Sequence, residues 1–337
     1  MILQKPENIL TDAFGRKHDY LRISLTERCN LRCFYCMPAE GIPLRPKDHF
    51  MRTEEIISIA KTFVELGVKK IRLTGGEPLI RKDADSIIKQ LSELPIELGI
   101  TTNGILVDQF IDCFEACGLK AINVSLDSLQ NEKMASITRR DYFDRIMSNI
   151  QLLIDRGFDV KINTVVMRGT NDDEIVDFIE WTRNTNVHVR FIEFMPFGGN
   201  DWDWSKGVSL DEILSRTTDR FGAFGFERIT DRANDTSKNY RLKGGIGTFA
   251  VISSVTNPFC DTCNRIRLTA DGKLKNCLFS NSETDLLTSL RAGNNILELI
   301  QDNILNKRSM RGGMDSISDF SNPALNQQNR SMVAIGG

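Results

Sequence analysis

The sequence predicts an α/β fold: an incomplete (β/α)6 barrel of the TIM type, followed by a C-terminal α+β extension that closes the barrel mouth. Two observations lead to this prediction. Between residues 20 and about 220, six strand-like runs alternate with helix-like segments. Along each run, polar side chains recur at every second position. We therefore expect a barrel core over residues 12–222 and an extension over residues 223–337.

The predicted elements follow one another as right-handed crossovers between parallel strands require. The predicted strands cover residues 20–26, 69–75, 97–103, 121–127, 159–167 and 187–194. Helix-like segments lie near residues 53–66, 81–93, 107–117, 141–156 and 172–184, and in the extension near 283–291 and 295–306. A doubly wound sheet would fit this alternation too, so the polar pattern of the strands has to decide.

The polar positions of the strands favour the barrel. A parallel strand that is covered by helices on both faces is apolar throughout. Here one face of the strands is polar at a period of two, at positions including Arg22, Ser24, Arg72, Thr74, Thr101, Asn123, Ser125, Lys161, Asn163 and Arg190. Solvent could explain one such strand. Six in succession indicate the polar inner face of an incompletely closed barrel that holds polar ligands.

The composition is that of an ordinary globular protein, with 41% hydrophobic and 26% charged residues. A formal net charge of −2 gives no general attraction to nucleic acid or to an anionic membrane, so we expect neither as a partner. The first ten residues show no secretory signal pattern, and no apolar run is long enough for a membrane span. These features predict a cytoplasmic protein and are compatible with a monomer or a homodimer.

Six of the eight cysteines form two groups of three. The first group has the spacing C-x3-C-x2-C and consists of Cys29, Cys33 and Cys36. The second has the spacing C-x2-C-x13-C and consists of Cys260, Cys263 and Cys277. A structural zinc site takes four ligands, and neither group has a histidine nearby in the sequence. Three thiolates suit an iron–sulfur cubane whose fourth iron stays open for a ligand. The other two, Cys113 and Cys117, fit a helix that buries its thiols.

The surroundings of the first group resemble the radical S-adenosylmethionine (SAM) superfamily. The segment CNLRCFYC is similar to its cluster motif, and LTGGEPLIR is similar to its glycine-rich element. The resemblance implies a 4Fe-4S cluster whose open iron binds SAM and whose electron cleaves SAM to a 5′-deoxyadenosyl radical. Independently of the resemblance, Gly75 and Gly76 would let a ligand approach the backbone closely at the end of a strand.

A narrower resemblance runs from about residue 12 to the C-terminus. The segments DAFGRKHDYLRISLTERCNLRCFYCMP, TTNGILV, INVSLDSL, RFIEFMP, CDTCNRIRLTADGKLKNCLF and the terminal IGG are similar to the GTP 3′,8-cyclase family of molybdenum cofactor biosynthesis. This resemblance implies a second 4Fe-4S cluster, held by the second group of cysteines, whose open iron binds the guanine of GTP. The implied reaction abstracts the ribose 3′-hydrogen and gives 3′,8-cyclo-7,8-dihydro-GTP. It also implies a low-potential electron donor that the sequence does not identify.

The resemblance assigns roles to individual residues as well. Contacts to SAM are expected from Tyr35, Gly76, Ser125 and Met195. Contacts to GTP are expected from Arg22, Arg72, Thr101, Lys161, Arg190, Arg265, Ile266 and Arg267. Catalytic roles are expected for Cys29, Cys33, Cys36, Arg265 and Arg267. The terminal Gly336 and Gly337 are expected to enter the barrel mouth. Arginine and lysine side chains suit a triphosphate, in agreement with the polar face of the strands.

Two alternatives stay open on the sequence. One is another radical SAM enzyme with an auxiliary cluster, such as a peptide-modifying enzyme, although such enzymes usually carry more cysteines in their C-terminal part. The other is a non-catalytic zinc or electron-transfer protein, which would not need a polar barrel interior. The segment GGIGTFA matches a dinucleotide fingerprint, but strand-like residues follow it where that site needs a helix, so we interpret the match as chance.

Overall fold

The fold is built on one sheet of twelve strands, in the computed structural model that describes residues 9–43, 45–200, 202–320, 322 and 329–336. The strand order is β12-β11-β10-β1-β2-β3-β4-β5-β6-β9-β8-β7. Its centre consists of the parallel strands β1 (Tyr20–Ser24), β2 (Lys70–Thr74), β3 (Glu97–Thr102), β4 (Ala121–Ser125), β5 (Asp159–Val166) and β6 (His188–Glu193). The predicted parallel α/β fold is confirmed.

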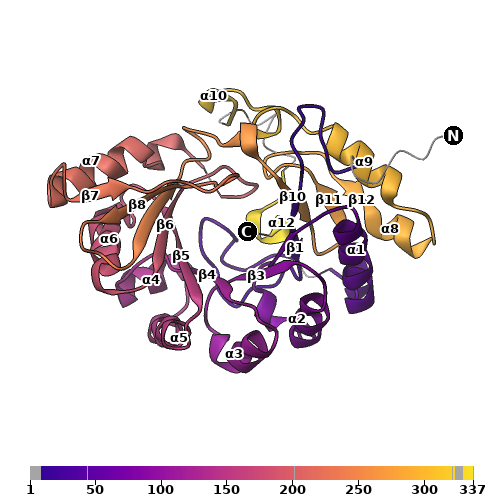
Figure 1. The fold of residues 1–337 in the computed structure, drawn as a ribbon, viewed down its shortest axis with the longest axis horizontal. Helices are drawn as coiled ribbons and strands as arrows, with labels where there is room; N and C mark the ends of the chain where they lie inside the picture. The colour runs from indigo at the N-terminus through magenta and orange to yellow at the C-terminus, as the bar shows by residue number, and fades with distance from the viewer. Residues whose placement is uncertain (1–8, 44, 201, 321, 323–328, 337) are drawn as a thin grey trace.

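Helices connect the parallel strands and cover the convex side of the curved sheet (Figure 1). The predicted ones are α1 (Thr53–Glu65), α2 (Ala84–Ser92), α3 (Val107–Ala116), α5 (Phe143–Asp155) and α6 (Ile175–Asn184). Two further helices, α4 (Asn131–Thr138) and α7 (Leu210–Phe221), were not among the predicted segments. Helix α7 has a local start signal, because the Ser209 hydroxyl accepts a hydrogen bond from the Glu212 amide. No helix in the described ranges is long and apolar enough to span a membrane.

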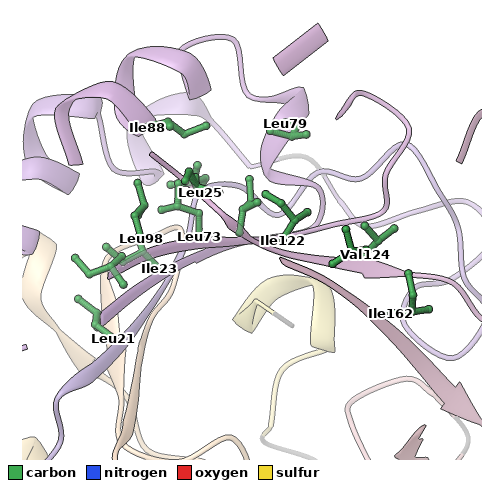
Figure 2. Packing of buried hydrophobic residues seen from close by; sticks show 14 of the residues in the cluster. Leu21, Ile23, Leu25, Leu73, Leu79, Ile88, Leu98, Ile122, Val124 and Ile162 are labelled. Carbon is green, nitrogen blue, oxygen red and sulfur yellow. The ribbon is translucent and has the colours of Figure 1, made fainter. Parts of the chain in front are cut away.

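The hydrophobic core lies between the sheet and these helices. Figure 2 shows Leu21, Ile23, Leu73, Ile122 and Val124 on the side of the strands that faces the helices, and all five are fully buried. Side chains alternate across a strand, so the polar residues between these positions point to the other side. The C-terminal helix α12 (Met332–Ile335) lies on that opposite side (Figure 2). The period-two pattern of the sequence therefore separates the core from an inner polar face.

The C-terminal extension continues the sheet at both of its edges. Strand β9 (Thr248–Ile252) pairs in parallel with β6, and β10 (Arg265–Leu268) pairs in parallel with β1. Beyond them lie the antiparallel strands β8 (Lys238–Leu242), β7 (Phe226–Arg228), β11 (Lys273–Lys275) and β12 (Thr284–Asp285). The helices α8 (Leu286–Arg291) and α9 (Leu297–Leu305) match the two that were predicted in the extension, and α10 (Ile317–Phe320) was not predicted. The pairing satisfies the backbone groups that β1 and β6 would otherwise expose.

Candidate functional site: two adjoining cavities

Two adjoining cavities lie on the polar inner face of the sheet. The walls of the N-terminal cavity include Cys29, Cys33, Tyr35, Cys36, Gly75, Gly76, Ser125 and Asp127. The walls of the C-terminal cavity include Arg22, Arg190, Met195, Cys260, Cys263, Arg265, Arg267 and Cys277. Both walls contain Thr101, Asn163, Ile192 and Met332. Because the cavities share part of their walls, ligands bound in the two would be neighbours.

The three cysteines of the first group are half-buried in the cavity wall. Burial raises the pKa of Cys29 to about 11 and that of Cys36 to about 12. Burial also raises the pKa of Cys33 well above its usual range, and the negative charges of Asp127 and of the other two thiolates add to the effect. The neutral thiol is therefore favoured until a positively charged centre is bound, because a buried thiolate needs a nearby positive charge.

The chemistry of the cysteines suits an iron–sulfur cluster, because thiolates are the usual protein ligands of such clusters. In the described part of the chain, no three His, Cys, Asp or Glu side chains are placed to hold one metal ion. A single zinc ion would need every sulfur at about 2.3 Å from one point. A cubane binds each of three thiolates through a different iron, so the sulfur atoms can lie farther apart. Each group of three cysteines lines one of the two cavities.

The glycine-rich segment after β2 packs against the chain that leads into the first cysteines. The Gly76 amide donates to the Thr26 carbonyl at 2.7 Å, and the Glu77 amide donates to the Arg28 carbonyl at 2.7 Å. A Cβ atom on Gly76 would lie 2.2 Å from the Arg28 carbonyl oxygen. Glycine is thus needed here for the close approach of two backbone segments, in addition to any ligand.

A buried carboxylate, Glu77, joins this segment to the end of β3. It accepts hydrogen bonds from the Thr102 hydroxyl at 2.8 Å and from the Asn103 amide at 2.7 Å. Burial raises the pKa of Glu77 to about 7, although these hydrogen bonds act against the rise. The Asn103 side-chain amide in turn donates to the Asn30 side-chain oxygen at 2.7 Å, beside Cys29. No role was predicted for Glu77 from the sequence. Its position directly after Gly75 and Gly76 is the feature that could have identified it.

A second buried carboxylate, Asp127, fixes the predicted SAM contact Tyr35. The Tyr35 hydroxyl donates to Asp127 Oδ2 at 2.7 Å, and the Val165 amide donates to Oδ1 at 2.9 Å. Burial raises the pKa of Asp127 to about 6, against the lowering effect of these two hydrogen bonds. The Tyr35 hydroxyl therefore donates its hydrogen within the protein and not to a ligand. The ring and the backbone of Tyr35 are left to line the cavity.

The C-terminal cavity is strongly cationic and incompletely paired. Arg22 Nε, Arg190 Nε and Arg265 Nη2 are buried and make no hydrogen bond to the described residues. The Arg190 guanidinium does donate to Asn163 Oδ1 at 2.6 Å. Burial and the charge of the nearby Arg72 lower the pKa of Arg190 to about 9. Buried cations without anionic partners are unfavourable, so this cavity is suited to a polyanionic ligand.

The structure places four of the residues expected to contact SAM or GTP as follows. Met195 lines the C-terminal cavity and not the N-terminal one. Arg72 and Lys161 line neither of the two cavities, and Arg72 donates to the Tyr20 hydroxyl at 2.7 Å and to the Ile100 carbonyl at 2.8 Å. The Ile266 side chain is fully buried in the core, so its backbone alone is left for a ligand. Sequence reasoning assigned no role to Tyr20, although its polar hydroxyl continues the period-two row of Arg22 and Ser24.

The C-terminal tail lies on the inner face, within the arc of the sheet (Figure 1). The Gly336 carbonyl accepts a hydrogen bond from Arg267 Nη1 at 2.6 Å. A Cβ atom on Gly336 would lie 2.5 Å from Thr74 Oγ1 and 3.0 Å from Ser24 Cβ. The backbone of Gly336 has φ of +80°, so glycine is required both by space and by conformation. Gly337 and its terminal carboxylate lie outside the described residues.

Comparison with known proteins agrees with the two halves of this site. Residues 23–182 match the family model described as the radical SAM superfamily, and residues 187–312 match the one described as Molybdenum Cofactor Synthesis C. A mitochondrial GTP 3′,8-cyclase of Arabidopsis thaliana is 46% identical over 336 residues, which are 98% of this chain and 84% of the plant protein. A GTP 3′,8-cyclase of Listeria welshimeri is 41% identical over 304 residues, covering 89% of this chain and 91% of the bacterial protein.

The chain belongs to the GTP 3′,8-cyclase family of radical SAM proteins. The resemblance drawn from the sequence is thereby confirmed. Membership of the superfamily implies a 4Fe-4S cluster and SAM, which the three cysteines lining the N-terminal cavity, Cys29, Cys33 and Cys36, fit. The two family models meet between residues 182 and 187, earlier than the predicted boundary at residue 222.

The chain is also similar to longer proteins. The chain spans about half the length of some curated relatives, such as molybdenum cofactor biosynthesis protein 1 of Drosophila melanogaster, which is 49% identical over 284 residues, 84% of this chain and 50% of the fly protein. Among solved structures, SuiB of Streptococcus suis bound to SAM has a TM-score of 0.63 at 16% identity, and the match covers 94% of this chain and 77% of SuiB. At this identity the similarity to SuiB shows a common fold and no more.

Proposed function

We propose that the chain is a radical SAM enzyme that converts GTP to 3′,8-cyclo-7,8-dihydro-GTP, the first step of molybdenum cofactor biosynthesis. The observation that carries this proposal is the pair of adjoining cavities. One contains the three cysteines of the radical SAM motif, and the other contains three more cysteines beside buried arginines with unpaired nitrogen atoms. The relatives from Arabidopsis and Listeria that bear the name GTP 3′,8-cyclase support the same assignment.

The N-terminal cavity would hold the first cluster and SAM. Cys29, Cys33 and Cys36 would bind three irons of the cluster, which together with SAM supplies the radical chemistry of the superfamily. Gly76 and Ser125 line the same cavity and would contact SAM. The protein's own contribution here is orientation and the exclusion of water, because Tyr35 is fixed by Asp127 and the glycine segment is fixed by Glu77.

The C-terminal cavity would hold GTP and a second 4Fe-4S cluster. Cys260, Cys263 and Cys277 would bind that cluster and leave one iron for the guanine. Arg22, Arg190 and Arg265 have unpaired nitrogens that triphosphate oxygens would satisfy. Thr101 and Asn163 belong to both cavity walls, so they stand where a ribose would meet SAM. The main contribution of the protein to catalysis would then be to hold SAM and GTP close together in the correct orientation.

The two parts of the chain would have different roles. We assign the core of residues 12–222 to an incomplete barrel that carries SAM, and residues 223–337 to an extension that closes the mouth and carries the second cluster. Support comes from β9 and β10, which flank the parallel strands at both edges, and from α12 on the inner face. The reducing electron would come from an external low-potential donor.

The decisive experiment is anaerobic incubation of the iron-reconstituted protein with GTP, SAM and a strong chemical reductant, followed by identification of the product. Formation of 5′-deoxyadenosine together with the cyclised nucleotide is expected. If SAM is cleaved but GTP is neither bound nor converted, the chain is another radical SAM enzyme, such as a peptide-modifying one. If neither SAM nor GTP is consumed by protein that holds its iron, the enzyme assignment is wrong.

Lys161 provides a test of the GTP assignment, because its charge lies near that of Arg190 in the cavity wall, although Lys161 itself lines neither cavity. Replacing Lys161 by alanine is expected to weaken GTP binding by about tenfold, since one close charge–phosphate interaction contributes on the order of 1.5–3 kcal/mol. The fold and iron content should be retained. The control is Lys89→Ala, which removes a lysine from an exposed ion pair with Asp85 on α2. Equal affinities for GTP in both variants would remove Lys161 from the site.

The same residue predicts how GTP binding depends on pH. Burial, with the charges of Arg190 and Arg72, lowers the pKa of Lys161 to about 8. A bound triphosphate raises this pKa, so GTP favours the protonated amine, and GTP affinity should fall as the pH rises above about 8. Lys161→Arg keeps its charge in this range and should lose the part of the decline that begins near pH 8. Titration calorimetry at several pH values measures the effect; a decline of the same size in both proteins would contradict it.

A further inference from the structure

A buried lysine, Lys307, contacts Cys263 of the second group of cysteines. Lys307 follows α9 and is only 4% exposed. Its Nζ atom lies 3.4 Å from Cys263 Sγ, 2.8 Å from His18 Nε2 and 3.1 Å from the Arg265 carbonyl oxygen. An ammonium group has three N–H donors, and these three acceptors use all of them. One N–H of a buried cation is thus directed at a sulfur that we assign to the second cluster.

His18 fixes this ammonium group in place. Its ring is fully buried, and Nδ1 lies 3.1 Å from the Leu10 carbonyl oxygen. A carbonyl can only accept, so Nδ1 carries the proton and Nε2 is left as an acceptor for Lys307. Burial and the positive charge of Lys307 lower the pKa of His18 to about 4, in keeping with a neutral ring. The result is a continuous chain of hydrogen bonds from Leu10 through His18 and Lys307 to Cys263.

The N-terminal segment around His18 is bound to the same cysteine loop by two more residues. Arg16 donates to the Cys260 carbonyl at 2.8 Å and to the Ser309 carbonyl at 2.7 Å. The Asn264 side-chain amide donates to Asp19 Oδ1 at 2.6 Å. The motif DAFGRKHD, which precedes the first strand, therefore holds in place a cysteine loop that is more than 240 residues away in the chain.

Cys29 of the first group and Cys263 of the second differ in the charge of their hydrogen-bond donors. Within the described residues, Cys29 Sγ accepts hydrogen bonds from two neutral amides, the Leu31 backbone amide at 3.4 Å and the Asn103 side-chain amide at 3.9 Å. Cys263 instead faces Lys307 and the side chain of Arg265. Cationic donors to sulfur favour the more negatively charged, reduced state of an iron–sulfur centre.

We propose that Lys307 is a positioning residue that raises the reduction potential of the second cluster through its N–H···S contact with Cys263, and that His18 holds Lys307 in this geometry. The inference rests on the proposed function, because it requires a cluster on Cys260, Cys263 and Cys277. It assigns a role to the buried lysine and to the DAFGRKHD motif, neither of which touches the ligands in the proposed reaction.

The test isolates the second cluster in the full-length chain. In the parent protein Cys29, Cys33 and Cys36 are replaced by alanine, so that the measured iron content and potential come from the second cluster alone. Lys307→Met and Lys307→Gln remove the charge at similar side-chain length, and Lys307→Arg retains it. After anaerobic reconstitution, iron is counted and the midpoint potential is measured by redox titration followed by electron paramagnetic resonance. Both neutral variants are expected to show a more negative potential than the parent, and Lys307→Arg is expected to stay closer to it.

The control places Lys307→Met in a chain that lacks Cys260, Cys263 and Cys277, where the potential of the first cluster should not move. Unchanged potentials in the neutral variants with full iron content would overturn the proposal. Loss of iron from both neutral variants would overturn it too, because Lys307 would then be needed to assemble the centre and not to tune it. A parent that binds no iron at all would instead refute the second cluster itself, which separates the failure of this inference from the failure of the proposed function.

Discussion

Replacing Gly336 by alanine is expected to lower the rate of GTP conversion by about 100-fold or more, because a displacement of about 1 Å at a reacting centre has an effect of that order. The added methyl group would meet Thr74 Oγ1 at 2.5 Å, and the backbone at φ of +80° disfavours any side chain. The tail would be pushed off the inner face, and the contact between Arg267 and the Gly336 carbonyl would be lost. Iron content and GTP affinity should stay close to those of the parent.

The matched control for Gly336→Ala is Gly118→Ala. Gly118 also has a positive φ, of +62°, but a Cβ atom there meets nothing within 4 Å. This control carries a similar backbone penalty of about 1–2 kcal/mol without a clash at the site. Deleting Gly336 and Gly337 should reproduce the loss of activity, and a peptide ending in SMVAIGG should restore part of it. Full activity in the deletion variant would show that the tail has no part in the reaction.

Replacing Cys260, Cys263 and Cys277 together by alanine is expected to halve the iron content, from about eight irons per chain to about four. GTP conversion should be abolished, because the site proposed for the guanine is gone. The first cluster should remain and should still cleave SAM, since its three cysteines line a different cavity. Iron analysis and detection of 5′-deoxyadenosine after anaerobic reconstitution measure the two expectations separately.

The control for the cysteine variant is Cys113→Ala with Cys117→Ala, which removes two free cysteines from the α3 region, outside both cavities. This double variant should keep about eight irons per chain. A full iron load in the variant that lacks Cys260, Cys263 and Cys277 would be inconsistent with a second cluster. It would leave the radical SAM fold intact and remove the proposed mode of GTP binding.

The six parallel strands could be predicted from the sequence because their signals are local. Strand β6 alternates buried Val189 and Phe191 with the less buried Arg190 and Ile192, and in the sequence the charged Arg190 between two apolar residues indicates which face is polar. The period-two rule therefore located the inner polar face before any ligand was considered. The short helix α4 was missed because its few apolar residues make only a weak pattern.

The pairing of the extension could not be predicted, because it joins residues that are far apart in the chain. Strand β10 lies beside β1 with Arg22 opposite Arg267, which places two arginines separated by 245 positions on neighbouring strands. Sequence periodicity indicates that a strand exists and which face is polar, but it contains no information on the neighbour that the strand will have. The cationic cavity depends on this pairing.

The sequence by itself determined the chemistry of the site: two groups of three cysteines, a glycine-rich segment and a row of cationic residues on the strands. These depend on residue type and local spacing, which the chain displays directly. The tertiary structure alone decided which of these residues meet. It placed Met195 in the C-terminal cavity, buried Ile266 in the core, and brought His18 to Lys307 beside cysteines that have no histidine near them in the sequence. The reason is physical, because the distance between residues remote in the chain is set by the packing and strand order of the whole sheet and not by local propensity.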